Sequence, residues 1–269
     1  MNNTNLNSNI VISVIGDTGK MGKAVILQLR NLEYTVFGYN SKNLISKDKL
    51  LDTKSQIVID CSLPSAVLNN IDIAIESQNK LIIATTGWYQ NLENVQNKLQ
   101  IAGLSAIVST NFDKIAILYR ILNSLASKIL GQDQNIKVGI FESHDSTKKD
   151  VSGTALSIAN EDILPYLAVQ NQIVFGSPSG GIIDTQLQII SERKHGKNPP
   201  IHIINYFDQV HNTTLSLSHS GDINRQNYAL GIVDSVTILL DSTKSFMGIK
   251  DYANDIIKPS ILFQLQNLN

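Results

Sequence analysis

The beginning of the chain joins a strand-like segment to a helix-like segment through a turn rich in glycine. The nearly continuous apolar run at residues 10–15 is typical of a strand buried on both faces. It leads directly into Gly16-x-x-Gly19-x-x-Gly22, and residues 24–32 then have the apolar spacing of an amphipathic helix. In this context glycines let a pyrophosphate lie over the helix N-terminus. The spacing differs from the standard Gly-x-Gly-x-x-Gly, so on its own it indicates only a glycine-containing turn.

The same alternation of short apolar runs and helical segments continues for about a hundred residues. Apolar runs at 34–39, 56–59, 80–84 and 106–109 alternate with helical segments at 65–77 and 92–102. This pattern predicts an α/β fold, a Rossmann-type doubly wound parallel sheet with helices on both faces. Ligands of such sheets bind at the carboxyl ends of the strands. Polar clusters follow these runs at Asn40-Ser41-Lys42, Asp60-Cys61-Ser62, Thr85-Thr86-Gly87 and Thr110-Asn111. Their shared position predicts a cofactor site more strongly than any single motif does.

The end of the second predicted strand bears on the choice of nicotinamide cofactor. Folds that prefer NAD usually place an acid there to hold the ribose hydroxyls. This chain has Asn40, followed by Ser41 and Lys42, which suit a 2′-phosphate. The segment therefore favours NADPH, and NADH stays open because surface lysines are common.

The second half of the chain has a different pattern. A long amphipathic helix is expected at 113–130, followed by a polar break at 131–134 that is the first candidate domain boundary. Residues 201–207 and 213–217 alternate as antiparallel strands do, and 228–240 should form a helix. We expect residues 252–265 to pack back on the first domain.

A charged segment from Glu142 to Ala155 holds the groups best suited to catalysis. It follows a strand-like run at 136–141 and precedes a helix expected at 155–167. His144 titrates near neutrality, and Lys148 is a cation that could hold an oxyanion or donate a proton. Ser152-Gly153-Thr154 marks a capped helix start, where backbone N–H groups suit a carboxylate. Taken alone, the segment is more often a solvated, charged loop before an ordinary capped helix than a catalytic site.

Composition excludes several classes of function. The formal net charge of -1 gives no electrostatic case for nucleic acid or an anionic membrane. The single cysteine, Cys61, cannot form an intrachain disulfide and fits a reducing, cytoplasmic location. No apolar run approaches the ~20 residues that span a bilayer, and the polar first nine residues do not look like a signal peptide. No tight His/Cys cluster is present, so we expect no metal, and a stoichiometric metal in purified protein would overturn this.

Six motifs lie in order over nearly the whole chain, at Gly16–Gly22, Asp60–Pro64, Ala84–Gly87, Ser109–Phe112, Glu142–Ala155 and at His219, Arg225, Tyr228, Ala229 and Gly231. Together they resemble the motifs of the dihydrodipicolinate reductase family of the diaminopimelate and lysine pathway.

The resemblance implies a role for each matched residue. His144 and Lys148 match the catalytic histidine and lysine, and Gly153 and Thr154 match the backbone pair that binds a substrate carboxylate, with Ser152 as part of the same helix start. Asp145 stands where the family has a second histidine that touches substrate. The cofactor contacts would be Gly16, Asp17, Thr18, Gly19, Lys20, Met21, Ala84, Thr85, Thr86, Ser109, Thr110, Asn111 and Phe112, beside Asn40 and Ser41 at the second strand.

The family's fold and activity then become expectations for this chain. The resemblance implies a dinucleotide-binding domain at 1–131 and 241–269, and at 132–240 a smaller α+β domain with a mixed sheet for substrate binding and oligomerisation. It also implies NADPH- or NADH-dependent reduction of a cyclic conjugated imine dicarboxylate, dihydrodipicolinate to tetrahydrodipicolinate, by a homotetramer.

Departures from the family pattern keep two alternatives open. Asp145 places an acid where a dianionic substrate would bind, and Val151 replaces a proline in a loop that is one residue shorter. These changes favour, as an alternative, a reductase of the same fold acting on a related imine or enamine acid. The other alternative is a cofactor-binding protein with little catalysis, which would have no need of both His144 and Lys148.

Overall fold

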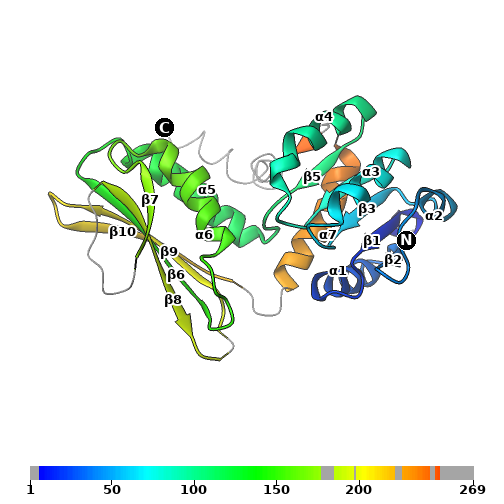
Figure 1. Cartoon of the computed structure of the whole chain (residues 1–269), viewed down its shortest axis with the longest axis horizontal. Helices are drawn as coiled ribbons and strands as arrows, with labels where there is room; N and C mark the ends of the chain where they lie inside the picture. The colour runs from blue at the N-terminus through cyan, green and yellow to red at the C-terminus, as the bar shows by residue number, and fades with distance from the viewer. Residues whose placement is uncertain (1–5, 177–184, 197, 222–225, 243–245, 249–269) are drawn as a thin grey trace, which may run out of the picture. The chain divides into compact units, whose positions relative to one another are not determined.

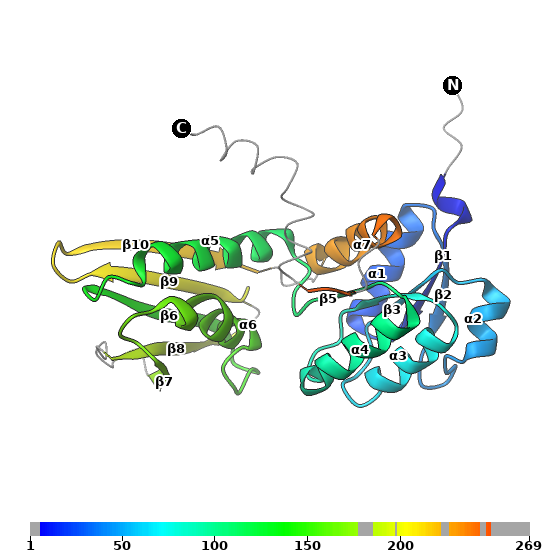
Figure 2. The same ribbon diagram turned by 90° about the horizontal axis from the view of Figure 1, so that it is seen from above.

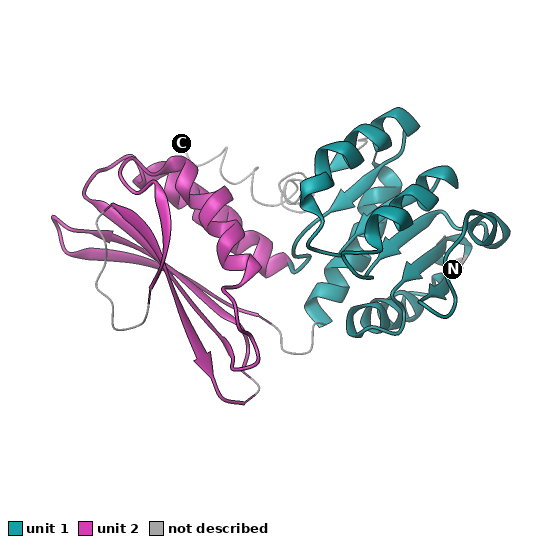
Figure 3. Cartoon of the chain, viewed as in Figure 1, with its two compact units in different colours: residues 1–113, 225–269 teal, residues 114–224 magenta. Residues whose placement is uncertain are grey.

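The computed structural model describes residues 6–176, 185–196, 198–221, 226–242 and 246–248 (Figure 1). The chain divides into two compact units, unit 1 at residues 1–113 and 225–269 and unit 2 at residues 114–224 (Figure 3). Among the described residues, none of the helices has the length and apolar character needed to cross a membrane.

Unit 1 is built on a parallel six-stranded sheet in the order β11-β5-β4-β3-β1-β2. The strands are β1 (Val11–Ile15), β2 (Thr35–Tyr39), β3 (Ile57–Asp60), β4 (Lys80–Ile83), β5 (Ala106–Val108) and β11 (Phe246–Met247). The helices are α1 (Lys20–Asn31), α2 (Lys47–Thr53), α3 (Val67–Glu76), α4 (Leu92–Ala102) and α7 (Gln226–Asp241). Helices α1 and α7 lie on one face of the sheet, and α3 and α4 on the other (Figure 2). The predicted doubly wound α/β architecture is confirmed.

The central strands are short and apolar because both of their faces are covered. All residues of β3 and β5 are buried, as are Ile12 and Val14 in β1 and Leu81 to Ile83 in β4. A strand with no solvated face favours apolar side chains, which accounts for the nearly continuous apolar runs in the sequence; Ser13 and Asp60 are buried polar exceptions.

The turn between β1 and α1 requires glycine at two positions. Gly16 has a φ of 85°, a conformation that favours glycine, and a Cβ atom there would lie 2.4 Å from the carbonyl oxygen of Cys61. A Cβ atom on Gly22 would lie 2.1 Å from the carbonyl oxygen of Gly16. The glycine spacing is therefore set by the close approach of β1, α1 and the end of β3.

Unit 2 contains a mixed five-stranded sheet in the order β10-β9-β6-β8-β7. The strands are β6 (Ile136–Asp145), β7 (Gln172–Gly176), β8 (Gln186–Lys194), β9 (Ile201–Asp208) and β10 (Thr213–Ser220). Strand β8 runs parallel to β6 and β7, whereas β9 runs antiparallel to β6 and β10. Helix α5 (Lys114–Leu130) and the segment from α6 (Gly153–Ser157) pack on this sheet in one buried apolar cluster. The expected mixed sheet is confirmed.

The two units divide at other residues than those predicted. Helix α5 was assigned to the first domain up to residue 131, but it belongs to unit 2, where the Tyr119 hydroxyl donates to the carbonyl oxygen of His202 at 3.1 Å. Helix α7 was assigned to the second domain up to residue 240, but it belongs to unit 1, where the Lys80 ammonium donates to the carbonyl oxygen of Leu239 at 2.8 Å. Long-range packing of these helices, rather than the polar break after α5, sets the division. The functions of the units stay predictions.

Other differences concern segments that carry little periodic signal. Strand β6 continues to Asp145, and the helix expected at 155–167 is a short α6 followed by a π-helical turn at Ile158–Ile163 and a 3-10 turn at Leu164–Tyr166. Helix α2 and strands β7 and β8 were not predicted. The segment expected to pack back, 252–265, lies outside the described residues, as does Arg225.

Candidate active site

The candidate catalytic histidine, His144, is the next-to-last residue of strand β6. Glu142 and His144 are two residues apart, so their side chains share one face of the sheet. The Nδ1 atom of His144 lies 3.4 Å from the Oε2 atom of Glu142, and the imidazole is 14% exposed. Burial lowers the pKa of His144; the Glu142 carboxylate opposes this effect, and the charges of Lys148 and Arg193 add to it. In the free protein His144 is therefore mostly neutral at pH 7.

Glu142 is a fully buried carboxylate surrounded by hydrogen-bond donors. Its Oε1 atom accepts from the Ser191 hydroxyl at 2.7 Å and from the Arg193 guanidinium at 3.0 Å. Its Oε2 atom accepts from the backbone N–H of Ser152 at 3.0 Å. Burial opposes ionisation, but hydrogen bonds from Ser152, Ser191 and Arg193 outweigh it and lower the pKa of Glu142. The group is thus an anion inside the unit.

The loop after β6 presents Lys148. It begins with a tight turn in which Asp145 accepts hydrogen bonds from the backbone N–H and the hydroxyl of Thr147, and these bonds lower the pKa of Asp145. The backbone N–H of Lys148 donates to the carbonyl oxygen of Asp145 at 3.2 Å. The Lys148 side chain makes no ion pair or hydrogen bond with any residue that the structure describes, so its ammonium is available to an anion.

The predicted capped helix start after this loop is confirmed. Ser152 has extended backbone geometry, and its hydroxyl accepts from the backbone N–H of Ala155 at 3.0 Å. The Gly153 and Thr154 N–H groups follow it at the first turn, where a helix offers no carbonyl partners of its own. A Cβ atom on Gly153 would meet no heavy atom within 4 Å. The backbone at Gly153 is therefore open to close approach by a ligand.

Two further histidines adjoin this site, and the sequence reasoning did not place them there. The His144 and His202 rings have centroids 5.3 Å apart at 76°, and those of His202 and His219 lie 6.2 Å apart at 20°. The Nε2 atom of His202 is 3.0 Å from the Ser152 hydroxyl. Burial, together with the charge of a protonated His144, lowers the pKa of His202 to about 3. The signal for this placement was the strand alternation at residues 201–207, which puts His202 opposite Glu142 once β9 pairs with β6.

The expectation that the chain binds no metal stays a prediction. Among the described residues, Glu142, His144 and His202 bring one potential ligand atom each to within 4.8 Å of one another. The Glu142 oxygens already accept from Ser152, Ser191 and the Arg193 guanidinium, whose positive charge would oppose a cation there.

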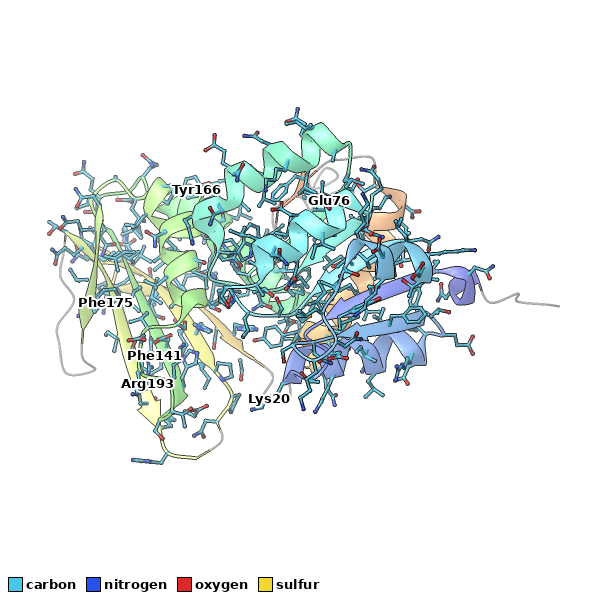
Figure 4. All side chains as sticks on the ribbon, turned by 45° about the vertical axis from the view of Figure 1, so that its right-hand side comes forward. Lys20, Glu76, Phe141, Tyr166, Phe175 and Arg193 are labelled. Atoms are coloured by element: carbon cyan, nitrogen blue, oxygen red, sulfur yellow. The ribbon has the colours of Figure 1, made fainter. Side chains whose placement is uncertain are left out.

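The residues expected to contact the cofactor lie at the carboxyl ends of the unit 1 strands. Lys20 begins α1 after the glycine turn (Figure 4). The N-cap residue is Gly19, which has no side chain that could hydrogen-bond to the N–H groups of this helix start. The Asn40 side-chain amide donates to Asp17 Oδ1 at 2.8 Å, which ties the end of β2 to the turn after β1. The free N–H groups at the start of α1 and the open glycine turn fit a pyrophosphate.

The expected cofactor residues differ in how accessible their side chains are. Fully or partly exposed residues are Gly16, Asp17, Thr18, Gly19, Lys20, Met21, Asn40, Ser41, Ala84, Thr86 and Thr110. Buried residues are Thr85, Ser109, Asn111 and Phe112. Thr85 donates to the buried Asp60 carboxylate, and Ser109 accepts from the backbone N–H of Asn111 at 3.1 Å. These side chains are buried beneath the strand ends, so these residues would contact a cofactor through their backbone atoms.

Comparisons with known proteins identify relatives over nearly the whole chain. A family model described as dihydrodipicolinate reductase, N-terminus, matches residues 10–112, and one described as dihydrodipicolinate reductase, C-terminus, matches residues 115–252. The 4-hydroxy-tetrahydrodipicolinate reductase of Rickettsia akari (strain Hartford) is 28% identical over 254 residues, 91% of this chain and 97% of the relative. That of Christiangramia forsetii is 24% identical over 89% of this chain and 96% of the relative.

Solved structures share the fold. Dipicolinate-bound dihydrodipicolinate reductase from Paenisporosarcina sp. TG-14 superposes with a TM-score of 0.71 at 21% identity, covering 89% of this chain and 97% of that one. The DAP dehydrogenase of C. glutamicum in complex with DAP gives a TM-score of 0.54 at 11% identity, covering 97% and 99%.

Proposed function

Since the chain belongs to the dihydrodipicolinate reductase family, we propose that unit 1 holds NADPH or NADH at its strand ends and that unit 2 reduces a cyclic imine dicarboxylate with His144 and Lys148. The protein is an NAD(P)H-dependent oxidoreductase of diaminopimelate and lysine biosynthesis, and its reaction converts dihydrodipicolinate to tetrahydrodipicolinate. The observation that supports the assignment of residues is a largely buried His144 imidazole beside the buried Glu142 carboxylate. The loop that follows carries the Lys148 ammonium, which has no partner among the described residues.

The reaction adds one hydride and one proton across a conjugated imine. When bound, the nicotinamide cofactor supplies the hydride. His144 gives the proton to the ring, and a dianionic substrate beside it favours the protonated imidazole by raising a pKa that burial lowers in the free protein.

The substrate carboxylates require positive partners. The Lys148 ammonium offers a charge, and the N–H groups of Gly153 and Thr154 offer donors at the start of a helix. The Ser152 cap and the Glu142 carboxylate fix the position of this helix start, because Ser152 hydrogen-bonds to both Ala155 and Glu142. The site is therefore preorganised for an anion.

The cofactor is NADPH rather than NADH in this proposal. Asn40 stands where an acid would hold the ribose hydroxyls, and its side chain is engaged with Asp17 and with the backbone N–H of Lys42 at 2.8 Å. Ser41 and Lys42 are exposed beside it and suit a 2′-phosphate. Measuring the Kd values of NADPH and NADH tests this choice.

Assembly into a homotetramer, with a cytoplasmic location, is also proposed. Helix α5 carries a stripe of exposed apolar side chains spaced three and four residues apart, at Ile115, Leu118, Leu122, Leu125 and Ile129, with exposed fractions of 37% to 68%. Such a stripe is typical of a surface that packs against another helix or subunit. Light scattering after gel filtration tests the number of subunits.

Turnover of the substrate tests the proposed function. Purified protein is mixed with NADPH or NADH while the preceding pathway enzyme makes the substrate in situ from pyruvate and aspartate semialdehyde. Rapid, protein-dependent oxidation of the cofactor is expected. Cofactor binding without oxidation would contradict the proposal and favour the second candidate, a reductase of a related imine or enamine acid, for which the acidic Asp145 beside Lys148 is the supporting observation.

A further inference from the structure

Arg193, near the end of strand β8 (Figure 4), holds the loop that carries Lys148 by its backbone. The Nε atom of Arg193 donates to the carbonyl oxygen of Lys148 at 2.8 Å, and the Nη2 atom donates to that of Asp150 at 2.7 Å. The Nη2 atom also donates to Glu142 Oε1 at 3.0 Å. We propose that Arg193 is a positioning residue that fixes Lys148 for catalysis, an inference that rests on the proposed function.

The end of the loop contacts the buried Glu142 carboxylate directly, and the middle of the loop is linked to it through Arg193. The Glu142 carboxylate accepts from Arg193 at one oxygen and from the backbone N–H of Ser152, at the end of the loop, at the other. Arg193 in turn bonds to the middle of the loop, at Lys148 and Asp150. The loop therefore has one preferred course between β6 and α6, and that course sets the position from which the Lys148 side chain starts.

The register of the sheet explains why an arginine at this position reaches the loop. Strands β6 and β8 are parallel neighbours, with Glu142 beside Ser191 and His144 beside Arg193. Arg193 thus projects from the neighbouring strand at the level of His144, while the loop begins directly after that level. A planar guanidinium donates in several fixed directions at once, which a lysine ammonium cannot reproduce in the same geometry.

The charge of Arg193 is paired with a buried carboxylate of unit 2, whereas that of Lys148 is not. The Arg193 side chain is 22% exposed and pairs with a carboxylate that has no exposed surface. Lys148 has no such partner among the described residues. This division leaves Lys148 as the cation for substrate and gives Arg193 a role that acts through Lys148. Displacing a catalytic group by about 1 Å can lower turnover by ~10²-fold, so a loose loop would be costly.

The test is a double-mutant cycle between Arg193 and Lys148. Arg193→Lys keeps the charge beside Glu142 and loses the fork, so kcat/KM is expected to fall by roughly tenfold or more. In a Lys148→Ala background, the same change is expected to alter kcat/KM by less than about twofold, because the group being positioned is already gone. Equal losses in both backgrounds would overturn the proposal.

The neighbouring cation provides a matched control. Lys194 is one residue away, and its ammonium pairs only with Glu192 at 3.2 Å among the described residues. Lys194→Gln is expected to leave kcat/KM within about twofold, since exposed ion pairs of this kind contribute little. Arg193→Ala, with methylguanidinium added to replace the fork, serves as a second variant. Methylguanidinium is expected to restore part of the turnover of Arg193→Ala. If neither Arg193 variant unfolds cooperatively, Arg193 is required for folding and the proposal is overturned.

Backbone amide exchange separates this inference from the proposed function. Deuterium uptake at residues 146–152 is expected to rise in Arg193→Lys and not in Lys194→Gln, whether or not the protein turns over this substrate. If wild type does not turn over the substrate but Arg193→Lys still shows the rise in deuterium uptake, the proposed reaction is refuted and the contact of Arg193 with the loop is supported. Unchanged uptake in an active enzyme would refute the inference alone.

Discussion

The Nδ1 atom of His144 lies 3.4 Å from the Oε2 atom of Glu142, and that carboxylate has no exposed surface. An anion at this distance favours a proton on Nδ1, which leaves Nε2 as the nitrogen for exchange with a substrate. Because Glu142 also accepts from Ser152, the same carboxylate lies beside the imidazole and holds the start of the helix that follows the loop. Proton donor and anion site are thereby linked through one buried group.

Removing either candidate catalytic side chain should reduce turnover and spare cofactor binding. His144→Asn is expected to lower kcat by roughly 10²- to 10⁴-fold, the range that positioned proton transfer contributes. Lys148→Ala is expected to lower kcat/KM, because the substrate carboxylate loses its cationic partner. Both residues belong to unit 2, so the Kd of NADPH, measured by fluorescence titration, should change by less than about twofold. His211→Asn, at an exposed turn, is the control. Loss of NADPH binding in either variant would show that the loop has been assigned to the wrong ligand.

Gly153→Ala should separate stability from substrate affinity. An added Cβ atom has no heavy atom within 4 Å, and alanine is the better helix former, so the melting temperature should stay the same or rise. A methyl group would occupy space that a carboxylate needs near the backbone, so KM for the dicarboxylate should increase by about tenfold. Gly139→Ala, on β6 and equally uncrowded, is the matched control for steady-state kinetics and calorimetry. An unchanged KM would argue against a carboxylate at this helix start.

Asp145→Asn should strengthen substrate binding modestly. Asparagine keeps an oxygen that can accept from Thr147 and removes a negative charge next to His144 and near Lys148. Because Asp145 is solvated, the expected decrease in KM is only about two- to fivefold and should shrink as salt is raised. Kinetics at low and high ionic strength test this. A higher KM would mean that Asp145 itself binds substrate.

Local pattern was sufficient to predict the Rossmann-type unit. Its central strands are buried on both faces and its longer helices are amphipathic, so these elements show their pattern within a few residues, and α4 has the predicted bounds 92–102. The long segment between α6 and β9 gave no comparable signal, because β7 and β8 pair in a sheet whose neighbours come from distant parts of the chain. The unit boundaries were misplaced for the same reason, since α5 and α7 are assigned by packing and not by sequence order.

The sequence groups those residues of the candidate site that are adjacent in the chain and not those that come from other strands. His144, Lys148 and the Ser152 cap lie within nine residues of one another, so a short segment was enough to suggest them. Arg193 lies in a basic cluster with Lys194, His195 and Lys197, and His202 lies on an alternating run, but neither pattern indicates a contact with residues 142–155. Their roles depend on the registers of β8 and β9 against β6, which become known only when the sheet is assembled.

Acid should destabilise the protein through His202. Its pKa is about 3 in the folded protein and 6.5 ordinarily, so between these values the unfolded chain binds more protons, and stability falls as pH drops below about 6.5 and is constant above it. From pH 7 to pH 5 the loss from this group is about 2 kcal/mol. Urea unfolding of His202→Gln should show a correspondingly smaller loss than wild type.

His211→Gln is the control for this pH dependence. The Asp208 carboxylate raises the pKa of the exposed His211, so any contribution has the opposite sign, present at low pH and lost as pH rises. His211→Gln should therefore lose as much stability on acidification as wild type does, or slightly more. Equal losses in wild type and His202→Gln would contradict a neutral, buried His202.

Transfer of isotope from cofactor to product tests the central claim most directly. The protein is incubated with NADPH deuterated at the transferring C4 position and with substrate made in situ, and the product is analysed by mass spectrometry. We predict tetrahydrodipicolinate carrying one deuterium, formed by wild type and strongly reduced in His144→Asn. Deuterium retained in the cofactor, with NADPH bound and the substrate unchanged, would contradict the assignment of this chain as a reductase of that imine.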